Sequence, residues 1–167
     1  SNRDRYEVFK SIRPGLPVVT TGYGARKHKV HRVVVDNYHG ELEAARHLLA
    51  SGHRRIAVIA GPEGRYDTAE RTRGYLDALS EADVPADSGP VVHGNWSLES
   101  GYERTRELLG AGRRFSAILA HSDLMALGCM SALKEQGLRI PEDVAVVGFD
   151  DIEVSRYVDP PLTCLLY

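Results

Sequence analysis

Short apolar runs recur along the chain, and segments with helical periodicity separate them. The run Ile56–Ala60 has no polar position and is closed by Gly61-Pro62, which is typical of a strand buried on both faces of a parallel sheet. Similar runs lie at Phe115–Ala120 and Val144–Phe149. Between the runs, apolar residues return every three or four positions, as they do on the buried face of a helix. The pattern therefore predicts strands that alternate with amphipathic helices.

This alternation predicts an α/β fold with a parallel, doubly wound sheet and a flavodoxin-like strand order. The expected strands are Pro17–Thr21, Val33–Val35, Ile56–Gly61, Pro90–His93, Phe115–Ala120 and Val144–Phe149. The expected helices are Asp4–Arg13, Gly40–Ser51, a helix from about Asp67 to Ala82, a helix from Ser97 to near Gly110, and Leu124–Gln136. In open sheets of this kind, ligands bind beyond the carboxyl ends of the strands.

Composition narrows the class of protein. A hydrophobic share of 43% over 167 residues is enough for a packed core, and the formal charge of −2 gives no field for nonspecific nucleic-acid binding. Two cysteines are too few for a disulfide framework, and no apolar run approaches the roughly 20 residues that span a bilayer. The sequence also has no signal-peptide core, so we expect a cytoplasmic protein.

The familiar motifs of catalysis, nucleotide binding and metal binding are missing. The segment Gly61–Gly64 is a poor phosphate cradle, because Pro62 has no N–H and no Lys-Ser/Thr pair follows. The sequence has no Gly-x-Ser-x-Gly, His-Glu-x-x-His or Cys-x-x-Cys motif. We therefore expect no enzyme activity, no cofactor and no metal.

Polar and aromatic residues follow four of the predicted strands. Paired charges can bind vicinal hydroxyls, and a flat ring can cover the apolar face of a sugar, so the combination favours carbohydrate binding. The position of Arg71 favours a functional role, because a cation in the first turn of the predicted helix opposes the helix dipole and is unfavourable for stability alone. Asp67, Ser122 and Asp123 could instead cap helices, Asp150 could cap a turn, and Trp96 could be a core residue. The candidates are Arg65, Asp67, Arg71, Trp96, Ser122, Asp123 and Asp150.

The helix Leu124–Gln136 is apolar on more than one side. Ala126, Cys129, Met130 and Leu133 form one stripe, whereas Leu124, Met125 and Leu127 spread onto other faces. A helix of this kind needs a second cover. It is either a deeply buried core helix or a helix whose outer side meets a partner subunit.

Several motifs, in order, resemble the lactose/galactose repressor (LacI/GalR) family of bacterial transcription factors. The resemblance covers about Pro17–Thr163, and the motifs are Gly52–Ala57, Gly61-Pro62 with Arg71 and Gly74-Tyr75, Ser100–Tyr102, Ser122–Gly128, Gly137–Val144, Val146–Asp151 and Pro160–Thr163.

The resemblance implies a two-lobed, periplasmic-binding-protein-like effector domain (type I) that forms a homodimer. An effector, usually a sugar or a nucleobase, lies between the lobes and changes the affinity for operator DNA. Arg71, Trp96 and Asp150 match effector-contacting positions, and Arg65 and Asp67 match loop positions that vary with the effector. Ser122 and Asp123 match a polar pair, with Ser where Asn is common, and Asp36 follows a strand of the N-terminal lobe. The expected dimer contacts are Met125, Cys129, Leu133, Ile152 and Tyr157.

The sequence also departs from the family pattern. It lacks the helix-turn-helix, so we expect no operator binding by this chain alone. We expect residues 1–55 to be part of an N-terminal lobe, residues 56–161 to form a C-terminal lobe, and residues 162–167 to begin a truncated crossover. Two rival functions remain: a transport-type periplasmic sugar-binding protein, and an α/β enzyme that uses Asp123 or Asp150 as an acid or base.

Overall fold

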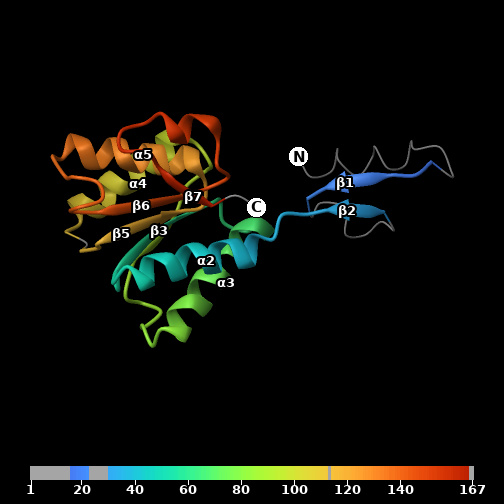
Figure 1. Cartoon of the computed structure of the whole chain (residues 1–167), viewed down its shortest axis with the longest axis horizontal. Coiled ribbons are helices and arrows are strands. Elements are labelled where there is room, and N and C mark those ends of the chain that lie inside the picture. Colours follow the sequence, from blue (N-terminus) through green and yellow to red (C-terminus); the bar gives the residue numbers. More distant parts are fainter. Residues whose placement is uncertain (1–15, 23–29, 113, 166–167) are drawn as a thin grey trace. The chain divides into compact units, whose positions relative to one another are not determined.

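The computed structural model describes residues 16–22, 30–112 and 114–165 (Figure 1). The chain divides into two compact units between Asp36 and Asn37, and each unit is described by itself. The helix expected at 4–13 and the end of the chain at 166–167 lie outside the described residues.

The described part of the first unit is a pair of short parallel strands. Strand β1 (Val19–Thr21) pairs with β2 (His31–Val33), with Val19 opposite His31 and Thr21 opposite Val33. The second strand was expected at 33–35, which is wrong by two residues. Register with β1 ends the pairing at Val33, so the apolar triplet that suggested the strand mostly follows it.

The second unit is built on a five-stranded parallel sheet. Its spatial order is β4-β3-β5-β6-β7, which is the flavodoxin-like order that was expected. The strands are β3 (Ile56–Ala60), β4 (Val91–His93), β5 (Ala117–Ala120), β6 (Ala145–Phe149) and β7 (Thr163–Leu165). Strand β7 was not predicted. It lies where a truncated crossover was expected and pairs with β6, with Thr163 opposite Val147.

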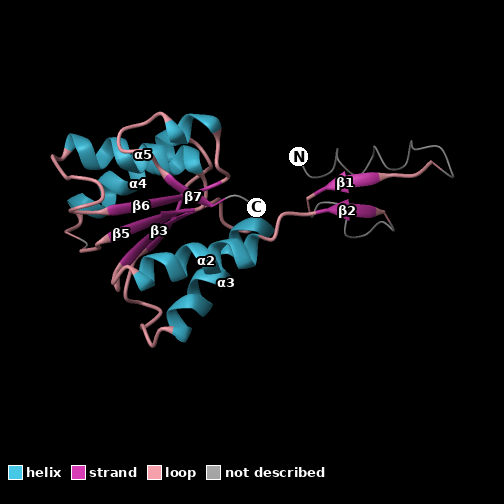
Figure 2. Cartoon of the chain, in the orientation of Figure 1, coloured by secondary structure: helices cyan, strands magenta, loops and turns pink. Residues whose placement is uncertain are grey.

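Two helices cover each face of this sheet (Figure 2). Helices α2 (Asn37–Ala50) and α3 (Tyr66–Glu81) lie on one face, and α4 (Leu98–Gly110) and α5 (Asp123–Glu135) lie on the other. Alternate residues of β3 point to opposite faces: Val58 packs with the α2/α3 core, and Ile59 with the α4/α5 core. Two-sided burial is the physical reason for the uninterrupted apolar run.

The division between the units differs from the expected boundary at residue 55. Helix α2 packs on α3 and on the sheet through Leu42, Ala45 and Leu48, so it belongs to the second unit. Its amphipathic pattern shows that one side is buried, but not which strands it packs against. The assignment of the two units to two lobes stays a prediction.

Helix α5 is a buried core helix. Met125, Cys129 and Leu133, expected at a dimer interface, have no exposed surface, because α4 is the second cover that the apolar pattern required. Of the two alternatives for this helix, burial in the core describes these three residues, and their place in a dimer interface stays a prediction. Ile152 and Tyr157 do reach the surface, Ile152 partly and Tyr157 largely, and the short 3₁₀ helix Glu153–Arg156 lies between them.

Candidate functional site

The candidate site lies at the carboxyl ends of the parallel strands of the second unit. Arg71, Trp96 and Asp150 follow three different strands, yet they meet there. The Arg71 guanidinium carbon lies 5.6 Å from the centroid of the Trp96 ring and 3.6 Å from that of Phe149. Arg71 Nη2 lies 3.9 Å from Asp150 Oδ1. The three side chains expected to share one site therefore do so.

The Arg71 guanidinium is buried and held by two acceptors. Its Nε donates to Asn37 Oδ1 at 2.8 Å, and its Nη1 donates to the His121 carbonyl oxygen. Burial lowers its pKa from the ordinary arginine value, and the nearby Glu41 and Asp150 oppose that shift. These contacts fix a cation in the second turn of α3, one turn further along than the sequence suggested, still near the end where the helix dipole disfavours it.

Trp96 and Asp150 adopt backbone conformations that non-glycine residues rarely show. Their φ angles are 72° and 118°, and Asp151 follows with 51°. Positive φ values cost free energy, and they concentrate at ligand sites, where the surrounding structure enforces them. The backbone strain at Trp96 and Asp150 is a second indication, independent of residue type, that this edge of the sheet forms a functional site.

The Asp150 carboxyl group is partly screened from water. Its side chain is 46% exposed, and burial raises its pKa to about 6, although Arg71 pulls the pKa down and Asp123 adds to the rise. Arg71 Nη2 and Asp150 Oδ1 are too far apart for a direct hydrogen bond. A hydroxyl group between them could accept from the guanidinium and donate to the carboxylate.

Arg65 and Asp67 form an ion pair on the loop that leads into α3. Arg65 Nη2 lies 2.9 Å from Asp67 Oδ2. Burial alone would raise the pKa of Asp67, but hydrogen bonds from Arg65 and the Thr68 amide outweigh it, so the pKa is lowered. Asp67 does not cap α3 as the alternative suggested, because the N-cap residue is Arg65 and Asp67 lies within the first turn.

Ser122 and Asp123 support the frame of the site. Ser122 is the N-cap of α5, and its Oγ accepts from the Met125 amide at 3.3 Å. Asp123 is fully buried, and its Oδ2 accepts from the Ile152 amide at 2.8 Å. Both side chains are buried, and Asp123 still acts on the charge of Arg71. Asp36 belongs to the first unit, so its place in a cleft stays a prediction.

Four residues of this cluster were missed from the sequence: Asn37, Glu41, His121 and Phe149. Glu41 could have been found, because it lies on the apolar stripe of α2 with Ala45 and Leu48, where a carboxylate is out of place. Phe149 was classed as the last core residue of a strand. His121 ended its strand without a motif around it, so nothing in the sequence pointed to its burial.

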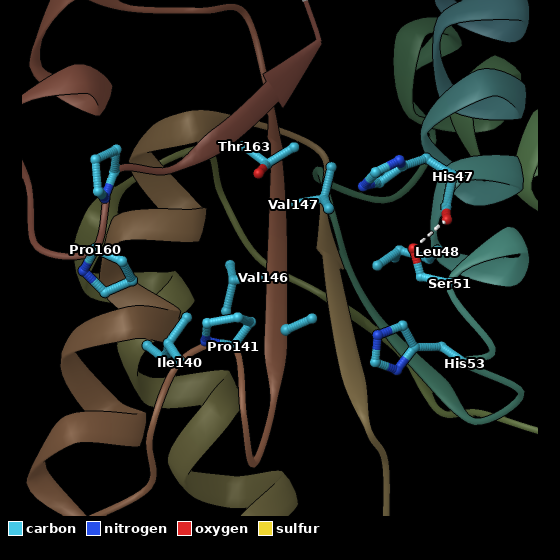
Figure 3. A pocket seen from close by; sticks show the side chains of 12 residues that line it. His47, Leu48, Ser51, His53, Ile140, Pro141, Val146, Val147, Pro160 and Thr163 are labelled. Atoms are coloured by element: carbon cyan, nitrogen blue, oxygen red, sulfur yellow. Dashed lines mark hydrogen bonds between the residues drawn. The ribbon is translucent and has the colours of Figure 1, made fainter.

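A separate hollow of about 440 Å³ lies at the opposite end of the sheet (Figure 3). Val146 and Val147 line it from β6, His47 from α2 and Ser51 from the turn after α2; Ser51 Oγ donates to the His47 carbonyl oxygen at 3.0 Å. The hollow holds none of the predicted ligand residues, and it lies by the amino ends of the strands, where ligands of open sheets rarely bind. It is not the candidate site.

In the described ranges, no group of three or more His, Cys, Asp or Glu residues is arranged to hold a metal ion. No helix within those ranges has the length and apolarity needed to cross a bilayer.

Known proteins share both the sequence pattern and the fold. A family model described as a periplasmic binding protein-like domain matches residues 45–165. The transcriptional regulator GalR of Salmonella typhimurium is 38% identical over 164 residues, which are 98% of this chain and 47% of the relative. The chain thus spans about half the length of such relatives.

Solved structures of LacI-type regulators superpose on the chain. A complex of the regulator CelR with cellobiose has a TM-score of 0.83 and 40% identity, covering 92% of this chain and 47% of that one. A dimeric Lac repressor has a TM-score of 0.84 and 30% identity, covering 99% and 60%. The match over residues 45–165 and the shared fold show that the chain belongs to the family of periplasmic binding protein-like domains, in the branch represented by LacI-family regulators.

Proposed function

We propose that the second unit supplies one wall of an effector site for a neutral, hydroxylated small molecule, most simply a carbohydrate. The observation that carries this proposal is the meeting of Arg71, Trp96 and Asp150 at one edge of the sheet. The cellobiose held by the related CelR supports the ligand class.

Each of the three residues has a distinct role in this proposal. The Trp96 ring covers the apolar face of a sugar ring, as flat aromatic side chains do in mostly apolar ligand sites. Arg71 donates and Asp150 accepts, so one hydroxyl group can bridge the 3.9 Å between them. Charge-assisted hydrogen bonds of this kind are stronger than neutral ones. Arg65 and Asp67 contact the variable part of the ligand.

The parent protein in this proposal is a cytoplasmic, non-catalytic transcription regulator. The effector binds between two lobes and changes the affinity of a homodimer for operator DNA, which is read by a helix-turn-helix outside this chain. Coupling between effector and operator of this kind is worth about 1–3 kcal/mol. The regulators GalR and CelR, which match nearly the whole of this chain, support this role.

Calorimetry with a panel of sugars tests the assignment in the full-length parent. Arg71→Ala and Asp150→Ala should each weaken binding by roughly 1–3 kcal/mol, because each leaves polar partners unpaired. Arg73→Ala is the matched control: Arg73 lies two residues further along α3, on its exposed side, and pairs with Glu70 at 2.9 Å. Unchanged binding in both site variants would refute the assignment, and chemical conversion of a sugar would favour an enzyme instead.

A further inference from the structure

Glu41 and His121 form a fully buried pair directly behind the candidate site. Both side chains are 0% exposed, and Glu41 Oε1 lies 3.3 Å from His121 Nε2. Among the described residues, no group makes a well-aligned hydrogen bond to either carboxyl oxygen of Glu41. Burying a carboxyl group in this way opposes folding. The pair therefore does not serve stability, and a role at the adjacent site is the alternative.

His121 touches both walls of the site. Its backbone carbonyl oxygen accepts from Arg71 Nη1. Its Nδ1 accepts from the Gly61 amide at 3.3 Å, and Gly61 lies so close to Trp96 that a Cβ there would be 2.1 Å from the indole ring. A change in the orientation of His121 would thus alter the positions of the Arg71 guanidinium and the Trp96 ring together.

The hydrogen-bond pattern decides which nitrogen of His121 carries the proton. Since Nδ1 accepts from the Gly61 amide, the neutral imidazole must hold its proton on Nε2. That nitrogen lies 3.3 Å from Glu41 Oε1, without an aligned hydrogen bond between them. The ring is therefore held by Gly61 at the end of β3, and its Nε2 lies beside the Glu41 carboxyl group of helix α2.

We propose that Glu41, acting through His121, is a positioning residue that sets the charge and placement of Arg71 in the effector site. The inference rests on the proposed function, because its consequence is a change in effector affinity. Glu41 does not touch the ligand in this proposal. It acts as a second carboxyl group, beside Asp150, whose charge reaches the guanidinium.

The protonation state of Glu41 gives the pair a pH dependence. Burial raises the pKa of Glu41 to about 8, against the pull of Arg71. Burial also lowers the pKa of His121 to about 3, with Arg71 and His93 adding to the shift and Asp67 opposing it. The imidazole is thus neutral near pH 7, and Glu41 is the group that titrates.

The charged groups around Glu41 and His121 determine whether effector affinity rises or falls with pH. Arg71 and Asp67 face it from α3, His93 from the end of β4, and Asp150 and Asp123 act on Arg71 from β6 and α5. An ionised Glu41 partly neutralises Arg71, which then donates less strongly to the ligand. Effector binding should therefore favour protonated Glu41, and affinity should fall as the pH rises through about 8.

The pH profile of sugar affinity between pH 6.5 and 9.5, measured in the full-length parent, tests the proposal. Each unit by which the ligand raises the pKa of Glu41 gives about a tenfold fall in affinity. Glu41→Gln keeps the shape of the side chain but cannot ionise, so its profile should lack this fall. Glu43→Gln, on the exposed side of the same helix beside Arg46, should keep it. Equal profiles for wild type and Glu41→Gln would overturn the inference while leaving the proposed function intact.

A second measurement needs no ligand. In the ¹⁵N-histidine-labelled chain, the Nε2 resonance of His121 should show the Nε2–H tautomer and shift with a midpoint near pH 8 as Glu41 ionises. The shift should be absent in Glu41→Gln. If no sugar binds the parent, the proposed function fails and this titration alone decides whether the pair is coupled. A pH-independent resonance in the wild type overturns the inference.

Discussion

At the scale of single residues, charge and strain coincide at Asp150. Its backbone is held at φ 118°, and burial raises its pKa to about 6 while Arg71 limits the rise. A carboxylate with a raised pKa lies close to losing its charge in mildly acidic solution. Its function as an acceptor is therefore tied to pH.

We predict that sugar affinity falls as the pH is lowered through about 6. Protonation of Asp150 removes the negative acceptor beside Arg71, and the folded-state pKa of about 6 sets the window. Asp150→Asn should bind more weakly at pH 7.5, and its affinity should change little down to pH 5. Isothermal titration at four pH values measures this. An acid fall of equal size in the variant would assign it to another group.

Residue type and position in the sequence identified some residues of the candidate site but not the others. Arg71 stood out because its position opposes the helix dipole, and Trp96 and Asp150 because they follow strand ends. The roles of Ser122 and Asp123 could not be separated in advance, since a cap and a ligand contact require the same polar side chain. In the structure both side chains accept from backbone amides, and their ligand contacts stay a prediction.

At the scale of elements, unbroken apolar runs were a sound guide to strands β3, β5 and β6. Strand β7 (Thr163–Leu165) was missed because it is short and follows two prolines. Helix α5 was recognised as needing a second cover, but its cover is α4. A sequence pattern tells how many sides of a helix are buried, and only the fold tells what buries them.

The crossing of α4 and α5 depends on Gly101. A Cβ at this position would lie 2.1 Å from the Met125 carbonyl oxygen, which is backbone and cannot turn aside. We predict that Gly101→Ala lowers the free energy of unfolding by about 1–3 kcal/mol through overpacking. Gly110→Ala, at the end of the same helix with open space around it, should be neutral or slightly stabilising. Urea denaturation compares the two, and equal effects would refute this account of the crossing.

At the scale of the whole molecule, the order of the motifs along the sequence said more about the fold and the family than any single motif. The strand order and the family were correctly predicted; the lobe boundary after residue 55 stays a prediction, and the compact units divide at Asp36/Asn37. The helix between those positions is amphipathic in either assignment. Only its packing on α3 and the sheet places it in the second unit.

The dimer proposal now rests on a different surface. Leu98, Leu124, Val154 and Tyr157 are exposed, with Tyr157 at 76%. They belong to segments that meet near the start of α5, where Asp123 bonds to the Ile152 amide and a Cβ at Gly128 would contact the Leu98 carbonyl oxygen. In the proposed homodimer, a second copy of the chain is the partner of this surface.

We predict that Tyr157→Glu weakens self-association of the full-length parent by at least tenfold, because it places a charge in an apolar contact. Arg156→Glu is less informative, since Arg156 pairs with Asp151. Glu99→Gln, on the first turn of α4, is a milder control. Sedimentation equilibrium measures the dissociation constant. A dimer as tight as the wild type would exclude this surface.

The unusual backbone at position 150 restricts how ligand preference can diverge. A branched or bulky residue would not tolerate a φ of 118°, so laboratory redesign is confined there to Asp, Asn or Gly. New specificities must then arise at Arg65 and Asp67, whose own φ values are not positive, with Gly64 (φ 75°) left in place before them. Libraries aimed at a biosensor for another sugar should diversify those two positions and leave the rigid end of β6 untouched.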